Sequence, residues 1–275
     1  MQPMLNIALR AARSAGEFIA RATEHIDLID VEVKGLNDFV TEVDRSAEKI
    51  ILQELKDKYP DHSYTAEESG TTKGTDKDSG KESEYEWIID PLDGTTNFIH
   101  GFPQFAVSIA VRYQGRMEHA VILDPLRHEE FTASRGRGAQ MNGKRLRVSN
   151  RKTLEGALIG TGFPFRNDQE AYLDNYLGML KDVTLKTAGI RRPGAAALDL
   201  AYVAAGRLDG FWEIGLQEWD MAAGVLLIQE AGGMVGDING GSTHLKTGNI
   251  VGGNPKVFKG LLQTIRPHIP EKMKR

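Results

Sequence analysis

The first 22 residues alternate between apolar and polar positions with the period of a helix. Arg10 and Arg13 interrupt any continuous apolar run, so the segment predicts an amphipathic helix and not a signal peptide. The apolar positions that would share one face are Leu5, Ala8, Leu9, Ala12, Ala15 and Ile19. A second helix is predicted where apolar residues recur from Val43 to Leu55, and Pro60 ends that pattern.

The pattern then changes to that of β-structure. Apolar positions alternate from Phe105 to Tyr113, and Gln114-Gly115 predicts a turn into the next strand. Asn142-Gly143 predicts a further hairpin, so this region is expected to form an antiparallel sheet. Residues 70–85 are polar, contain glycine and lack periodicity, which predicts a mobile surface loop.

The second half mixes helices with short strands. Helices are predicted over 168–183, 195–206 and 218–233, and strands near 158–161, 208–213 and 249–253. The expected fold class is α/β, in a layered arrangement of helices and sheets. We expect one compact unit with a seam near residue 150, in which residues 1–150 carry most candidate metal ligands and residues 151–275 complete the site.

Composition narrows the classes of function. The 275 residues include no cysteine, which excludes disulfides, thiolate nucleophiles and cysteine-ligated metals. Any metal must therefore be held by oxygen or histidine. The net charge of −4 argues against bulk nucleic-acid binding. No stretch approaches the roughly 20 apolar residues that span a bilayer, so we expect a soluble, cytoplasmic protein without a membrane partner.

The run "EWIIDPLDGTTNF" at residues 86–98 combines an apolar strand with unusual chemistry. Asp90, Pro91, Asp93 and Gly94 are common turn residues, so an ordinary turn is one interpretation. The other is a cation site followed by a phosphate cradle, because glycine lets the backbone approach a ligand and amides at a helix start bind anions. The placement directly after "WIID" favours the second.

Further carboxylates supply the oxygen ligands that Mg²⁺ prefers. The Glu67-Glu68 pair precedes the polar loop, and Asp220 lies at the predicted start of a helix. Read singly, the pair is typical of a solvated surface and Asp220 of a helix cap. Together with Asp90 and Asp93 they predict a magnesium-dependent phosphatase that uses metal-activated water.

A phosphatase with an aspartate nucleophile is excluded by the same run. The haloacid-dehalogenase superfamily also has an aspartate-glycine-threonine run after an apolar strand, but its nucleophile lies two residues before the second aspartate. Pro91 occupies that position here, so no aspartyl-phosphate can form there.

Two long motifs in the right order, "DPLDGTTNF" and "WDMAAG", with "EES" before them, resemble the signatures of the inositol monophosphatase family. The similarity extends through "DFVTEVD", "GIRRPGAAALDLAYVAAGRLDGFWE" and "EAGG", and is greatest to a bacterial type within the family. It implies an αβαβα sandwich, inositol-1-monophosphatase activity on a small phosphate monoester, lithium sensitivity and a homodimer.

The resemblance also implies a set of metal ligands. Glu67, Asp90 and the carbonyl of Leu92 would hold one Mg²⁺, and Asp90, Asp93 and Asp220 a second. A third, weaker ion would share Glu67. Glu67 is also counted with the catalytic residues. The expected cofactor is thus two to three Mg²⁺ ions.

Water and phosphate are assigned to neighbouring residues by the same resemblance. Asp44 and Thr95 would orient the attacking water and help to deprotonate it. The amides of Gly94 and Thr95 would bind phosphate, and Lys34 would approach it, although Lys34 is equally typical of a solvated lysine.

Substrate hydroxyls are implied to contact Glu213 and the backbone near Ala196, with Asp93 and Asp220 within reach. Glu213 as a plain strand-end carboxylate is the alternative. Pro193 departs from the expected pattern and removes one backbone donor there, which leaves the preference among polyol phosphates open. A related sugar or nucleotide phosphatase is the alternative.

A second function comes from residues 135–152, which hold seven basic residues and no acidic one. A solvated hairpin is the favoured interpretation. Bacterial members of the family are also associated with antitermination complexes of RNA polymerase and Nus factors, and a basic face could serve such contacts.

Overall fold

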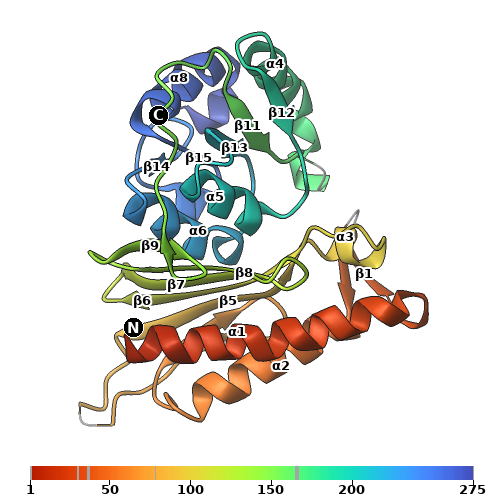
Figure 1. Ribbon diagram of the computed structural model, residues 1–275, viewed down its shortest axis with the longest axis vertical. Helices are drawn as coiled ribbons and strands as arrows, with labels where there is room; N and C mark the ends of the chain where they lie inside the picture. Colours follow the sequence, from red (N-terminus) through yellow and green to blue (C-terminus); the bar gives the residue numbers. More distant parts are fainter. Residues whose placement is uncertain (1, 30, 36–37, 78, 165–166, 275) are drawn as a thin grey trace.

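The chain folds into five alternating layers of helices and sheets (Figure 1). The computed structural model describes residues 2–29, 31–35, 38–77, 79–164 and 167–274. An eight-stranded sheet and a five-stranded sheet enclose one pair of helices, and further helices cover the outer face of each sheet. The predicted layered α/β class and αβαβα order are confirmed.

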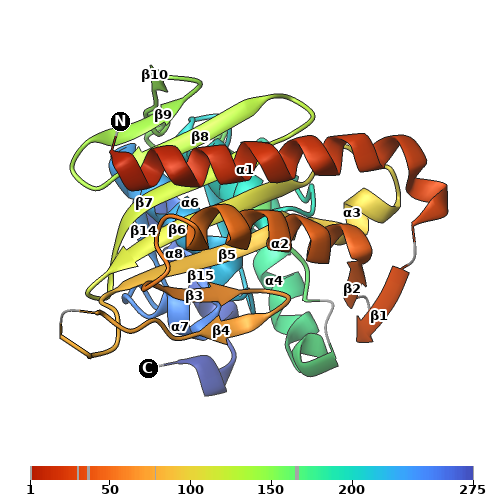
Figure 2. The ribbon, with the colours of Figure 1, turned by 90° about the horizontal axis from the view of Figure 1, so that it is seen from below.

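The first layer consists of α1 (Pro3–Ala22) and α2 (Glu42–Lys56), which lie side by side across one face of the large sheet (Figure 2). α1 buries the apolar face that its sequence predicts, from Leu5 to Ile19. The 3₁₀-helix η1 (Thr23–Leu28) and the hairpin of β1 (Val31–Gly35) and β2 (Asp38–Thr41) connect the two helices.

The large sheet has the order β10-β9-β8-β7-β6-β5-β3-β4. Its strands are β3 (Ser63–Ala66), β4 (Gly70–Thr72), β5 (Tyr85–Asp93), β6 (Ala106–Tyr113), β7 (Arg116–Asp124), β8 (Glu129–Ser134), β9 (Gly138–Met141) and β10 (Lys144–Arg145). Both predicted turns are present, at Gln114-Gly115 and at Asn142-Gly143, and all four residues have positive φ.

The strands from β5 to β10 pair antiparallel, as predicted for this region. The sheet also contains two strands that the sequence did not predict, and one of them, β3, pairs parallel with β5. The segment 70–85 is not loop throughout, because its first three residues form the exposed edge strand β4 and Thr75 bridges Glu82. Alternation cannot reveal β4, since a strand of three polar residues has no apolar face to read, and it does not report the direction in which two strands pair.

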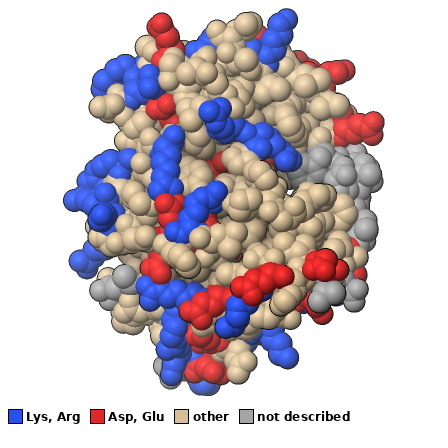
Figure 3. Space-filling view, turned by 45° about the vertical axis from the view of Figure 1, so that its right-hand side comes forward, with Lys and Arg blue, Asp and Glu red and all other residues tan. Residues whose placement is uncertain are grey.

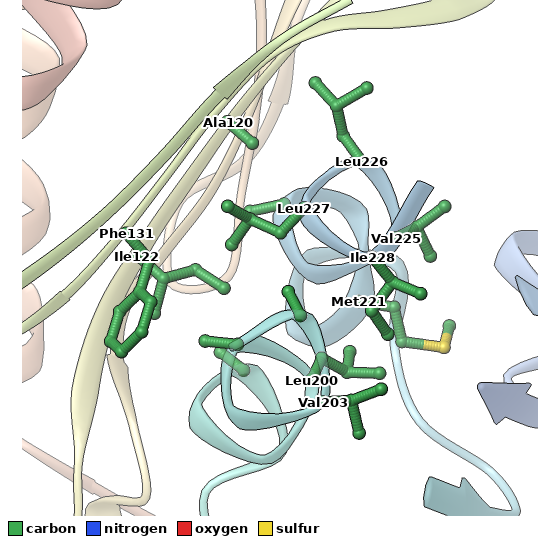
Figure 4. Packing of buried hydrophobic residues seen from close by; sticks show 14 of the residues in the cluster. Ala120, Ile122, Phe131, Leu200, Val203, Met221, Val225, Leu226, Leu227 and Ile228 are labelled. Atoms are coloured by element: carbon green, nitrogen blue, oxygen red, sulfur yellow. The ribbon is translucent and has the colours of Figure 1, made fainter. Parts of the chain in front are cut away.

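The middle layer is formed by α5 (Ala196–Ala204) and α6 (Glu218–Glu230). Every residue of α6 from Met221 to Ile228 is buried, as expected for a helix with sheets on both sides. Ala120, Ile122 and Phe131 of the large sheet belong to the same apolar cluster as these helices (Figure 4).

The small sheet has the order β12-β11-β13-β15-β14. Its strands are β11 (Leu158–Thr161), β12 (Gly189–Arg191), β13 (Gly210–Glu213), β14 (Met234–Gly236) and β15 (Ile250–Gly253). The outer helices are α4 (Leu173–Thr184) and α8 (Pro255–Ile265), and the remaining short helices are α3 (Thr95–Ile99), α7 (His244–Thr247), η2 (Asn167–Tyr172), η3 (Arg266–His268) and η4 (Glu271–Met273).

The predicted helix 168–183 is 3₁₀ in its first part, η2, and α-helical only from Leu173. None of the described helices combines the length and the apolar character needed to cross a membrane.

Candidate active site

Two of the predicted ligands lie at the ends of adjacent parallel strands. Ala66 of β3 pairs with Ile89 of β5, and the amide of Glu67 donates to the carbonyl of Ile89 at 3.1 Å. Because parallel strands end at the same edge of a sheet, the next residues, Glu67 and Asp90, come out side by side. The parallel pair that the sequence did not predict therefore builds the centre of the site.

The chain then turns sharply at Gly94. Its φ is +96°, a conformation that favours glycine, and a Cβ there would lie 2.8 Å from the carbonyl oxygen of Gln104. The turn starts the short helix α3 at Thr95. The predicted phosphate-binding amides of Gly94 and Thr95 thus lie immediately beyond Asp93.

Asp44, in the first turn of α2, forms a hydrogen bond with Thr95 of this turn. It is 1% exposed, and its Oδ2 accepts hydrogen bonds from the amide (2.9 Å) and hydroxyl (2.6 Å) of Thr41, which caps the helix. The hydroxyl of Thr95 donates to Asp44 Oδ1 at 2.8 Å and also lies 3.1 Å from the carbonyl of Leu92. One hydroxyl proton serves one acceptor at a time, so Asp44 and the Leu92 carbonyl compete for it.

Asp93 and Asp220 join the two halves of the chain at the site. Asp93 Oδ2 accepts from the amide of Ala197 in α5 at 2.7 Å. Asp220 Oδ2 accepts from the amide of Gln217 at 2.7 Å, at the start of α6. Asp220 therefore does cap its helix, and the same carboxyl group also faces the site.

A cavity of about 490 Å³ brings most of the predicted residues together. The predicted site residues that line it are Glu67, Asp90, Leu92, Asp93, Gly94, Thr95, Ala196, Glu213 and Asp220. Asp44 lies behind the wall and reaches the site through Thr95. The side chain of Lys34 is outside the described part of the structure, so its assignment stays a prediction.

The pKa values of three aspartates at the site, Asp90, Asp93 and Asp44, are raised. Burial raises the pKa of Asp90 well above its ordinary value, and the charges of Glu67, Asp93 and Asp220 raise it further. Burial also raises the pKa of Asp93, as do Asp220 and Glu213, against the opposing hydrogen bond from Ala197. The pKa of Asp44 is raised by burial, although its bonds to Thr41 and Thr95 lower it.

This repulsion is what a bound divalent cation would remove, and carboxylate and carbonyl oxygens suit Mg²⁺. The residues therefore fit a magnesium site by their donor atoms. They do not form a finished cage: among the described residues, no three Asp, Glu or His side chains are drawn together closely enough to hold a metal ion.

The cavity is also lined by residues that the sequence did not predict. Arg192 lies 5.3 Å from the ring of Phe163, and both line the cavity with Asp199. Burial raises the pKa of Asp199 well above its usual value. The "RRPGAAALD" run, which contains Ala196, was the available signal, but only the fold shows which of its side chains line the cavity.

Glu213 also lines the cavity, at the last position of β13, and is 7% exposed. A Cβ on Gly162 would fall 1.8 Å from Glu213 Oε1, so the chain after β11 passes close to this carboxyl group. Pro193 lies between Arg192 and Gly194, which both line the cavity, and its carbonyl accepts from the side chain of Asn97 at 2.8 Å.

The basic segment 135–152 lies away from this cavity, in the β9–β10 hairpin and the chain that follows. Arg135 pairs with Glu118 at 3.0 Å and Arg151 with Asp209 at 3.2 Å. On the face shown in Figure 3, positive and negative side chains are interspersed. Glu118 and Asp209 thus offset part of the positive charge of the segment 135–152.

Comparison with known proteins agrees with this architecture. The chain is 64% identical over 275 residues to "Nus factor SuhB" of Pseudomonas aeruginosa and 53% identical over 275 residues to that of Escherichia coli, with 100% of each chain covered. The structure of "extragenic suppressor protein suhB" from Bartonella henselae matches with a TM-score of 0.92 at 44% identity, over 98% of this chain and 100% of that one.

An inositol monophosphatase from Anabaena matches with a TM-score of 0.83 at 36% identity, over 98% of this chain and 97% of the other. The sequence profile described as "Inositol monophosphatase family" matches residues 1–270. The resemblance inferred from the two motifs is confirmed, and the chain belongs to the inositol monophosphatase family.

Proposed function

We propose that this protein is a Mg²⁺-dependent phosphomonoesterase that hydrolyses myo-inositol monophosphate to inositol and phosphate by direct attack of water. One observation carries the proposal: carboxyl groups from three separate segments, at Glu67, Asp90–Asp93 and Asp220, line one cavity beside the Gly94–Thr95 turn. Carboxyl groups with raised pKa values that gather in one cavity are typical of a functional site.

Different residues would bind the metal, take up the proton and bind the phosphate. Glu67, Asp90, the Leu92 carbonyl, Asp93 and Asp220 would hold Mg²⁺, which supplies a water of lowered pKa and charge neutralisation when bound. Asp44 accepts a hydrogen bond from the Thr95 hydroxyl. The pair could therefore take up a proton from an attacking water through Thr95 and hold it at Asp44. The Gly94 and Thr95 amides would position the phosphate.

Inositol as the leaving group is supported by the polar lining of the cavity. Glu213 and Ala196, the first residue of α5, both line it, and a polyol ring could form hydrogen bonds there. The name of the Anabaena relative is consistent with this substrate. A polar wall of this kind favours a hydroxyl-rich alcohol over an apolar one.

The deciding experiment is a substrate panel. Phosphate release is measured from inositol 1-phosphate, 2-glycerophosphate and a hexose phosphate, first with Mg²⁺ and then with chelator. We expect the highest kcat/KM for inositol 1-phosphate and no release with chelator. Hydrolysis that persists in metal-free protein contradicts the metal dependence, and a higher kcat/KM for another ester contradicts the inositol assignment.

A second function is favoured by the relatives named "Nus factor SuhB", which match over the full length of this chain. We propose that the protein also binds an antitermination complex of RNA polymerase and Nus factors in the cytoplasm, as a homodimer, with residues 135–152 as one contact. Co-purification with the polymerase complex tests binding, and light scattering tests the dimer.

A further inference from the structure

Glu48 is a buried carboxylate that the proposed chemistry does not use. It lies in α2 and is 3% exposed. Its Oε2 accepts from the amide of Glu68 at 2.8 Å, and its Oε1 accepts from the amide of Ser69 at 2.9 Å. Burial of a charged group is costly unless it is hydrogen-bonded, and here two backbone amides meet that need.

Those two amides follow Glu67 directly and belong to the turn between β3 and β4. The turn has weak support on its far side, because β4 is exposed along its whole length and ends the order of the sheet. On its near side, Glu67 is fixed by its backbone bond to Ile89. Glu48 therefore accepts two hydrogen bonds that attach the second half of this turn to α2.

Glu48 also shares a helix face with Asp44, which precedes it by four residues, or about one turn. Asp44 reaches Thr95, and Glu48 reaches the turn after Glu67. One rigid helix thus contacts both the water-orienting pair and the segment that carries a metal ligand.

We propose that Glu48 is a positioning residue that fixes the turn after Glu67 and so holds the Glu67 carboxyl group beside Asp90 for metal binding. The inference rests on the proposed function, because it takes Glu67 to be a metal ligand.

A carboxylate suits this task better than an amide. Two backbone N–H groups require two acceptor oxygens, and an ionised carboxylate gives two charge-assisted bonds. Glutamine has the same size, but it offers one acceptor and would turn its NH₂ group towards the second N–H. Glu48→Gln therefore removes one bond without leaving a cavity.

The matched control is Glu54→Gln. Glu54 lies in the same helix, but its carboxyl group bonds Arg10 (2.6 Å) and Ser14 (2.6 Å) of α1, away from the turn. Both variants lose one negative charge from α2. A difference in Mg²⁺ affinity between the two variants therefore comes from the turn after Glu67 and not from a change of charge in α2.

Mg²⁺ binding is measured by calorimetry on wild type and both variants, with hydrogen exchange of the peptide covering residues 67–69. For Glu48→Gln we expect an Mg²⁺ dissociation constant raised about 10–100-fold, the usual effect of losing an outer hydrogen-bond partner of a metal site, and faster exchange. At saturating Mg²⁺ its kcat should return towards wild type. Glu54→Gln should match wild type in all three measurements.

If wild type and Glu48→Gln bind Mg²⁺ equally, the positioning role is wrong while the proposed function stands. If wild type itself binds no Mg²⁺, the proposed function fails first. Should Glu48→Gln not fold, Glu48→Asp replaces it: the charge is kept but withdrawn by one methylene, and the same direction of change is expected. An unchanged Mg²⁺ affinity in Glu48→Asp would then overturn the proposal.

Discussion

The hydroxyl of Thr95 donates to the Oδ1 atom of Asp44 at 2.8 Å, across 51 residues of sequence. The two residues occupy the first turns of different helices, α3 and α2, which approach each other only in the folded chain. Asp44 is held from the other side by Thr41, so its position does not depend on Thr95 alone.

This pair should act as one unit in catalysis. We expect Thr95→Ala and Asp44→Asn each to lower kcat about 10²–10⁴-fold, the usual contribution of a positioned proton acceptor. The double variant should be little worse than the poorer single variant, because either change breaks the same relay. Multiplicative losses in steady-state phosphate-release assays would show that the two residues act independently.

Asp93→Asn should separate catalysis from folding. Asparagine keeps an oxygen that can accept from the Ala197 amide, but it removes a charge that Asp220 and Glu213 repel. We therefore expect turnover to fall at least about 100-fold, with a metal-free Tm equal to or above that of wild type. Phosphate release and thermal melting by circular dichroism check both parts; undiminished turnover, or a clear fall in Tm, would count against this account of the site.

Glu213→Gln tests substrate identity. If Glu213 binds a ring hydroxyl, a charge-assisted bond becomes a neutral one, and kcat/KM for inositol 1-phosphate should lose about 1–3 kcal/mol of transition-state stabilisation. For 2-glycerophosphate, which lacks the ring, the loss should be much smaller. Equal losses for both substrates would mean that Glu213 supports the metal site or the fold instead.

His62 should make stability depend on pH. It stacks between Tyr59 and Tyr85, with ring centroids at 4.8 and 4.7 Å, and its Nδ1 accepts from Trp87. Burial lowers the pKa of His62, although Asp61 opposes the shift. The unfolded chain, with a histidine pKa of about 6.5, then binds the proton more readily than the folded one.

The contribution of neutral His62 to the free energy of unfolding is therefore fully present above about pH 6.5, and it is lost as the pH falls below that value. Buried His119 and His244, whose pKa values are also lowered, add to the same trend. His62→Phe should cost stability at pH 8 but reduce the additional loss between pH 7 and pH 5. Urea unfolding at these pH values measures it, and a slope equal to that of wild type would rule out the contribution of His62.

The sequence by itself determined much of the local structure. Helical periodicity predicted α1 and α2, the "NG" and "QG" pairs predicted their turns, and the apolar run before Gly232 predicted α6. These features depend on the conformational preferences of residues that are close together in the sequence, so a short stretch of sequence is enough to predict them. The two long motifs also identified the family, since their residue order is too specific for ordinary turns.

Only the tertiary structure decided how these pieces meet. The parallel pairing of β3 with β5 brings Glu67 beside Asp90, and the bond from Ala197 attaches α5 to Asp93. The roles of Arg192, Asp199 and Glu48 could not be read from the sequence, because they depend on contacts with distant segments. Periodicity reports which face of an element is buried; which carboxyl groups share a cavity depends on strand direction and layer packing, and these are fixed only when the whole chain folds.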